Sequence, residues 1–140
     1  MPIGTAEIRR PGRHATVVAT SMMVLRALAA AERLAQEGIE AEVIDLRTIR
    51  PMDTDTVVAS VSRTGRLVVV YEGVKTLGVG AEVSARIAES EAFDYLDAPI
   101  VRLGGREVPL PYNPTLEKAA VPQEDDIVAA IRRLVREGKA

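Results

Sequence analysis

The residues best suited to chemistry lie in the segment YEGVKTLGVGAE, residues 71–82. Glycine-rich loops that lead into a helix can cradle a phosphate with their backbone N–H groups. In a Walker A loop, however, Lys and Ser or Thr follow the second glycine at once, whereas Lys75 and Thr76 precede Gly78. A dinucleotide fingerprint that begins at Gly78 would need Gly or Ala in place of Val83. The segment is therefore predicted to be a flexible positioning loop.

Few other side chains could assemble a reactive centre. Glu72 ends an apolar run and could act as an acid or base, but no His, Cys or second carboxylate lies nearby in the sequence. His14 is the only imidazole and is predicted to be a surface residue rather than a ligand. The absence of cysteine excludes disulfides, iron–sulfur clusters and thiol nucleophiles. We therefore expect no catalytic, cofactor-binding or metal-binding residues.

The segment EVIDLRTIRPMD turns from an apolar strand into a charged loop. Pro51 cannot continue a strand ladder or lie inside a helix, whereas Asp53 is a good N-cap for a following helix. Arg47 and Arg50 are predicted to lie in the loop and to find nearby carboxylates such as Asp45 or Asp53.

Composition limits the class of protein. A chain of 140 residues is about one domain, and without Trp and with one Phe its core must be built from Val, Ile, Leu and Ala. A formal charge of −2 with no basic block argues against nucleic acid as a partner. The sequence shows neither a signal-peptide pattern nor an apolar run of membrane-spanning length. We therefore expect a soluble cytoplasmic protein with no membrane partner.

Apolar runs and helical patterns alternate along the chain. The runs ATVVAT, AEVIDL, RLVVVYE and APIVRLG predict buried strands. Helices are predicted over residues 22–38, 54–64, 81–93 and 123–138, and residues 105–122 are predicted to be a proline-punctuated connector. This order predicts right-handed crossovers and a three-layer α/β/α sandwich.

Local patterns refine these elements. Ser21 stands where an N-cap would precede the first helix, and Met22, Leu25 and Ala29 are predicted to form the face that packs on the sheet. The run TAEIRR alternates like an edge strand. Across the short PGRH link, the pattern alone predicts a hairpin between TAEIRR and ATVVAT.

Several segments together resemble a known family. PIGTAEIRR, EVIDLRTIRPMD, SVSRTGRLVVVYEG, GVGAEVSARIAE, YLDAPIVRLGG and VPLPYNPTLEKAAVP resemble the C-terminal, transketolase-like domain of the β subunit of 2-oxo acid dehydrogenase E1 components, the pyruvate and branched-chain enzymes. The resemblance runs almost from end to end. DLRTIRPMD followed by SVSRTGR is specific to that family within the wider transketolase-like group.

The resemblance implies an enzyme larger than this chain. The complete E1 contains two α and two β subunits, uses thiamine diphosphate and Mg²⁺, decarboxylates a 2-oxo acid and passes the acyl group to a lipoyl arm on E2. In the family, the cofactor contacts and catalytic histidines lie in the α subunit and in the N-terminal half of β, which we expect to be absent here. Residues 1–140 are thus expected to be one domain, an excised or split piece with residues 1–14 as edge strand and linker remnant. By itself, this domain is expected to bind no cofactor and to be inactive.

The resemblance also implies contacts and a sheet order. The loop with Glu72, Gly73, Gly78 and Gly80 matches a family segment near subunit contacts, whose partners are the E1 α subunit and a second β subunit. Asp97 falls where a family carboxylate can meet the basic subunit-binding domain of the E2 acyltransferase, and the alternative is a turn-forming role. For the fold, the resemblance implies a five-stranded mixed sheet of order 1-3-2-4-5, with the first strand antiparallel beside AEVIDL. We follow it over the hairpin.

Two other functions remain open. A standalone anion-binding or small-ligand-binding module would use helix N-termini at Ser21 and Gly80. A fragment of another thiamine enzyme, of the transketolase or deoxyxylulose phosphate synthase type, would hold a substrate phosphate with Arg47, Arg50 and Arg102.

Overall fold

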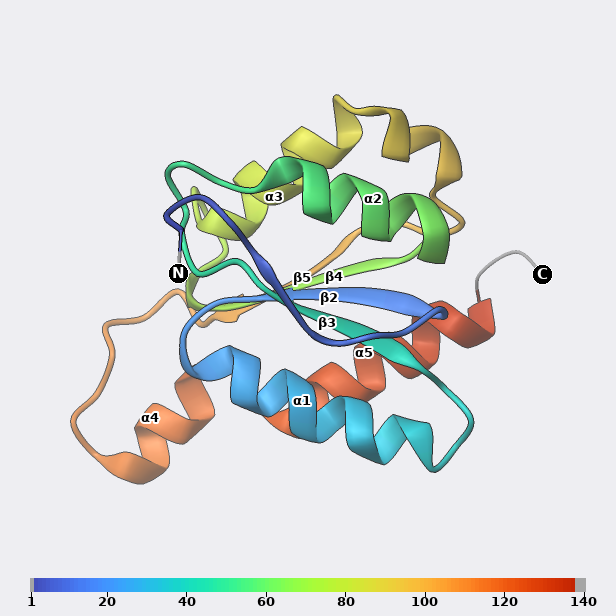
Figure 1. The fold of residues 1–140 in the computed structure, drawn as a ribbon. Helices are drawn as coiled ribbons and strands as arrows, with labels where there is room; N and C mark the ends of the chain where they lie inside the picture. The colour runs from blue at the N-terminus through green and yellow to red at the C-terminus, as the bar shows by residue number, and fades with distance from the viewer. Residues whose placement is uncertain (1, 138–140) are drawn as a thin grey trace.

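The computed structural model describes residues 2–137, in which helices cover both faces of one sheet (Figure 1). The strands are β1 (Glu7–Arg10), β2 (Ala15–Ala19), β3 (Ala41–Asp45), β4 (Leu67–Val74) and β5 (Val101–Gly105). The helices are α1 (Met22–Ala35), α2 (Thr54–Thr64), α3 (Val79–Ala88), the 3₁₀ helix η1 (Glu91–Tyr95), α4 (Pro114–Ala120) and α5 (Glu124–Glu137).

The sheet has five strands in the order β1-β3-β2-β4-β5, and only β1 runs antiparallel to its neighbour. The mixed sheet implied by the resemblance is confirmed, and the hairpin between the first two strands is wrong. Every residue of β2 is buried, and parallel neighbours occupy both of its edges. The PGRH link instead crosses the start of β3, where a Cβ on Gly12 would lie 2.2 Å from the Glu42 nitrogen. No free edge of β2 remains for β1.

Two apolar layers hold the sheet between its helices (Figure 1). One layer joins α1 and α5 to the sheet, with Val17, Val43 and Val68 among the strand residues. The other joins α2 and α3 to the opposite face, with Val18 and Ile44 alternating toward it. The three-layer sandwich predicted from the order of elements is therefore confirmed.

The start of α1 differs from the prediction. Ser21 has a positive φ of 53° and its side chain makes no capping hydrogen bond. Met22 and Leu25 are 51% and 59% exposed, so they do not form the sheet-facing side of the helix. The buried face consists of three alanines and three larger side chains: Ala27, Ala30 and Ala31 with Met23, Val24 and Leu34. At 100° per residue, Met22 and Leu25 lie on the side of the helix that carries Arg26, Glu32 and Arg33, so the charged residues already marked this side as exposed.

Cap signals explain where the other helices begin and end. α2 matches the predicted range: Asp53 accepts a hydrogen bond from the Thr56 N–H at 3.1 Å, and Gly65 ends the helix with a φ of +68°. The predicted helix over 81–93 is wrong in extent, because α3 ends at Ala88 and the Ser90 hydroxyl caps η1.

The predicted connector contains a helix that the sequence analysis missed. Asn113 accepts hydrogen bonds from the N–H groups of Thr115 and Leu116, and Pro114 occupies the first turn of α4, where a missing N–H costs nothing. α4 and the loop before it project from the body of the fold near the start of α1 (Figure 1).

Candidate functional site

The candidate site lies at the carboxyl ends of β2 and β4, where the sheet order reverses. Ligands and partners of open parallel sheets bind at such switch points. Two cavities of about 380 and 350 Å³ open there. We call this region the carboxyl-edge surface and define it by lining residues of these two cavities: Met22, Ile49, Glu72, Leu77 and Leu110.

Glu72 occupies the centre of this surface and lines both cavities. Its carboxylate forms no ion pair within 4.0 Å among residues 2–137. Glu117 and Lys118 line one of these cavities with it, but neither forms an ion pair with its carboxylate. Its position at the switch point agrees with a contact role, which stays a prediction.

Gly78 and Gly80 have a reason inside the chain to be glycine. A Cβ on Gly80 would lie 2.2 Å from Cε1 of Tyr71, and one on Gly78 would lie 2.7 Å from its Cε2. Tyr71 is 2% exposed, and its buried hydroxyl has no hydrogen-bond partner among residues 2–137. At Gly73, by contrast, a Cβ would meet only Tyr71 Cδ2 at an ordinary 3.8 Å. Packing therefore explains two of the predicted interface glycines, and the interface role of the four residues remains a prediction.

The sequence analysis missed several apolar side chains that loops of the fold expose, among them Leu77 in the glycine-rich loop. Leu77 has a φ of +54° and is 98% exposed, and Ile49 and Tyr112 are also exposed. A left-handed conformation is rare for a bulky residue and costs about 1 kcal/mol or more. The available signal was an apolar residue enclosed by glycines in a segment too short for an element.

The three arginines weighed as phosphate ligands do not form one cluster. Arg47 forms an ion pair with Glu7, so the expected Asp45 or Asp53 is not its side-chain partner. Arg102, on β5, donates a hydrogen bond to the carbonyl of Lys75 at 2.9 Å. Arg47 and Arg50 lie in the loop that follows β3. In the sheet, β2 and β4 separate β3 from β5, which carries Arg102. This arrangement counts against a shared phosphate site.

Two further polar residues have structural partners. Burial raises the pKa of Asp53, but hydrogen bonds from the Ala6 N–H at 2.9 Å and from Thr56 outweigh it and hold this pKa below its ordinary value. Nδ1 of His14 accepts a hydrogen bond from the Glu40 N–H at 2.8 Å. Both residues therefore join segments of the fold.

Asp97 lies at the opposite end of β4 from the carboxyl-edge surface. Its N–H donates to the Gly65 carbonyl at 2.8 Å, and its carboxylate lies 4.0 Å from the guanidinium of Arg66. The side chain is 44% exposed. Asp97 thus joins the start of β4 to the segment after η1 and leaves a carboxylate partly open to solvent; the turn role and docking of E2 both stay predictions.

Among residues 2–137, no group of three or more His, Cys, Asp or Glu is arranged to hold a metal ion. No helix in the same range is long and apolar enough to cross a membrane.

Comparisons with known proteins identify the relatives of the chain. The family described as "Transketolase, C-terminal domain" matches residues 4–127. The chain is 54% identical over 133 residues to pyruvate dehydrogenase E1 component subunit beta-1, mitochondrial, of Arabidopsis thaliana, and this match covers 95% of the chain and 36% of the relative. It is 50% identical over 139 residues to the mitochondrial E1 beta subunit of Dictyostelium discoideum, covering 99% of the chain and 39% of that protein. The predicted family resemblance is confirmed.

A solved structure described as "Split gene transketolase, inactive beta4 tetramer" has the same fold. It aligns with a TM-score of 0.84 at 27% identity, over 99% of this chain and 44% of that chain. The chain therefore spans less than half the length of each of these relatives.

The names of the sequence relatives correct one expectation. They are mitochondrial proteins, which contradicts the predicted cytoplasmic location. The prediction rested on the lack of a signal-peptide pattern and of an apolar run of membrane-spanning length, and neither feature distinguishes one aqueous compartment inside the cell from another.

Proposed function

Because the chain belongs to the transketolase C-terminal domain family, we propose that it is the assembly domain of a thiamine diphosphate-dependent 2-oxo acid dehydrogenase E1 β subunit of the pyruvate dehydrogenase type. Its role is to bind other parts of the enzyme rather than to react with substrate. The partners are the E1 α subunit, a second β subunit and the subunit-binding domain of E2.

The cofactor chemistry belongs to another part of this enzyme. The described residues offer no group of three or more carboxylates or histidines for Mg²⁺. These side chains do not fit a metal–diphosphate group. The chain spans 36% to 39% of two E1 relatives, which leaves most of their length to supply that site.

The observation that carries the proposal is the exposed apolar character of the carboxyl-edge surface. Leu77 is held outward in an unfavourable backbone conformation although it contacts little of its own chain. Met22, Ile49 and Leu110 add exposed apolar side chains from three other segments. Contiguous exposed apolar surface of this kind marks interaction sites. Burial of these side chains against a partner removes them from water, which is favourable and stabilises the assembly.

A substitution at Leu77 tests the proposal without risk to the fold. We would express the E1 β subunit that carries this domain with its α subunit and measure assembly by size-exclusion chromatography with light scattering. Leu77→Asn suits the left-handed conformation and removes the apolar anchor. Phe93→Asn is the matched control, because Phe93 is 57% exposed but lies on η1, away from this surface.

The expected result is partial or complete dissociation with Leu77→Asn and wild-type assembly with Phe93→Asn. Equal assembly of both variants would show that the carboxyl-edge surface is not the contact. Decarboxylation of pyruvate or a branched-chain 2-oxo acid by residues 1–140 alone would contradict the noncatalytic role.

A further inference from the structure

The loop between β3 and α2 has the sequence LRTIRPMD, residues 46–53, and carries Ile49 into the carboxyl-edge surface. Ile49 is 53% exposed and lines the cavity of about 380 Å³. The two ends of the loop are fixed by the sheet and by α2, because the Leu46 N–H donates to the Ala19 carbonyl at 3.2 Å and Asp53 caps the helix. The stretch between these ends belongs to neither element, so its path depends on another segment.

The N-terminal segment at the start of β1 supplies that support. We call residues 4–7 the strap. The Gly4 N–H donates to Oγ1 of Thr48 at 3.1 Å. Gly4 also lies close against the ring of Pro51, where a Cβ at position 4 would be 2.8 Å from Cγ. The strap therefore holds the loop on both sides of Ile49.

The rest of the strap reaches the ends of the same loop. The Glu7 carboxylate forms an ion pair with the guanidinium of Arg47. Arg47 has a φ of +58°, a conformation that persists only where the surrounding structure fixes it. The Ala6 N–H donates to the Asp53 carboxylate at 2.9 Å. The contacts of the strap thus extend along the whole loop.

We propose that the strap positions Ile49 for the contact between the carboxyl-edge surface and another subunit, an inference that rests on the proposed assembly function. The strap binds Thr48, directly before Ile49, whereas Ile49 itself faces the cavity. A side chain on a supported loop loses less conformational entropy when a partner binds than one on a free loop. Glu7 and Thr48 are therefore positioning residues, which act through Ile49.

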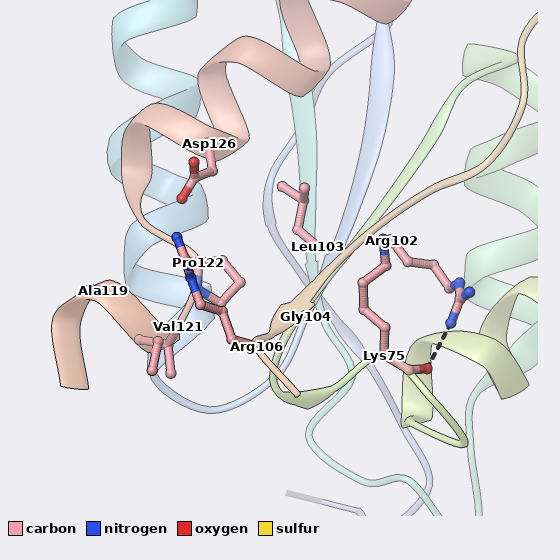
Figure 2. Close-up of a pocket in the computed structure, with 10 residues that line it drawn as sticks. Lys75, Arg102, Leu103, Gly104, Arg106, Ala119, Val121, Pro122 and Asp126 are labelled. Carbon is pink, nitrogen blue, oxygen red and sulfur yellow. Dashed lines mark hydrogen bonds between the residues drawn. The ribbon is translucent and has the colours of Figure 1, made fainter. Parts of the chain in front are cut away.

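The second loop of this surface is held without the strap. The Arg102 guanidinium on β5 donates to the Lys75 carbonyl at 2.9 Å (Figure 2), and the Glu107 carboxylate accepts the Thr76 N–H at 3.1 Å. Both contacts hold the residues directly before Leu77. Loss of the strap should therefore leave Leu77 in place, which supplies an internal control.

The first test measures the motion of methyl groups by NMR relaxation in the full 140-residue chain. Thr48→Val keeps the shape of the side chain and removes the acceptor of the Gly4 N–H, and Glu7→Gln removes the charge that pairs with the loop. In the double variant, the order parameter of the Ile49 methyl groups should fall, whereas those of Leu77 should stay as in wild type.

The matched control is the double variant Thr115→Val and Glu32→Gln, which makes the same chemical changes at exposed residues of α4 and α1. It should leave the methyl groups of Ile49 and Leu77 unchanged. An unchanged Ile49 in the strap variant, or an equal change at Leu77, would overturn the positioning role. This test needs no partner, so its outcome is separate from that of the proposed assembly.

The second test asks whether the strap acts on assembly through Ile49. In the E1 β subunit that carries this domain, the strap variant should weaken assembly with the α subunit about fivefold, the effect of one net hydrogen bond. In an Ile49→Ala background the same variant should cause no further loss, because the residue that it positions is gone.

Two results would contradict this coupling. An equal loss in both backgrounds would show that the strap acts on stability alone. Unchanged assembly of the strap variant, in a complex that Leu77→Asn does weaken, would show that the position of Ile49 does not matter. If Leu77→Asn has no effect, the proposed function fails, and the NMR result still decides whether the strap holds the loop.

Discussion

The contact between Tyr71 and Gly80 gives the sharpest test of how the glycine-rich loop is built. The ideal Cβ of residue 80 lies 2.2 Å from Tyr71 Cε1, well inside any real carbon–carbon contact. Gly78 confines the other edge of the ring, where a Cβ would lie 2.7 Å from Cε2. The ring therefore cannot step aside, and Gly80→Ala must strain the start of α3.

The expected cost follows from two opposing effects. Overpacking a confined core position costs about 1 to 3 kcal/mol, and this geometry belongs at the upper end. Replacing glycine by alanine inside a helix returns about 1 kcal/mol. Gly80→Ala should therefore destabilise the chain by about 2 kcal/mol. In a Tyr71→Leu background, which removes the Cε atoms, the same change should stabilise by about 1 kcal/mol, a coupling of about 3 kcal/mol.

Urea unfolding of residues 1–140, followed by far-UV circular dichroism, measures all four members of this cycle. With a slope of about 1 to 3 kcal/mol per molar urea, a 2 kcal/mol loss shifts the midpoint by roughly 1 M. Gly73→Ala is the control, because its Cβ would meet only an ordinary contact at 3.8 Å, and it should change stability by less than about 0.5 kcal/mol. An equal effect of Gly80→Ala in both backgrounds would refute the packing explanation.

Three further predictions concern stability. Tyr71→Phe removes a buried hydroxyl without a partner and should raise the free energy of unfolding by about 1 to 2 kcal/mol, whereas a loss in a thermal melt would reveal a partner. Because the folded-state pKa of Asp53 is lowered, its carboxylate contributes stability above the unfolded pKa of about 3.9 and loses it as pH falls through the folded value. The stability advantage of wild type over Asp53→Asn should therefore shrink below about pH 4 in urea titrations, and a constant difference would contradict this. Leu77→Asn should leave the isolated chain within about 0.5 kcal/mol of wild type or slightly more stable, and a loss above about 1 kcal/mol would mean that Leu77 packs internally.

The buried strands and the bounds of α2 could be predicted because their signals are local. Apolar runs such as ATVVAT are long enough to identify a strand buried on both faces. Asp53 and Gly65 act through hydrogen bonds and dihedral angles within a few residues of themselves. The sheet order could not follow from such signals, because the choice between β2 and β3 as the neighbour of β1 depends on which edges other strands occupy.

Two kinds of signal explain the features that the sequence analysis missed: several prolines close together, and contacts that form only in the folded chain. Asn113 and Pro114 are favourable N-cap and first-turn residues for a helix. Three prolines within six residues nevertheless led to the prediction of a connector without a helix. The wrong face of α1 has another cause: Met22 and Leu25 are apolar, but they share a side of the helix with Arg26, Glu32 and Arg33, and they are exposed. For Leu77, the glycines around it were a signal in the sequence, but its outward direction depends on the positive φ that only the structure shows.

The two predicted roles of the glycine-rich loop, packing and contact, are compatible because different residues carry them. Gly78 and Gly80 are required from inside, since the Tyr71 ring fills the space that their side chains would occupy. Leu77 lies directly before Gly78 and points outward with a positive φ. The Tyr71 ring thus sets the path of the backbone on which Leu77 is presented. A change that disturbs Tyr71 should therefore weaken both the stability of the chain and its proposed assembly, whereas a change at Leu77 should weaken assembly alone.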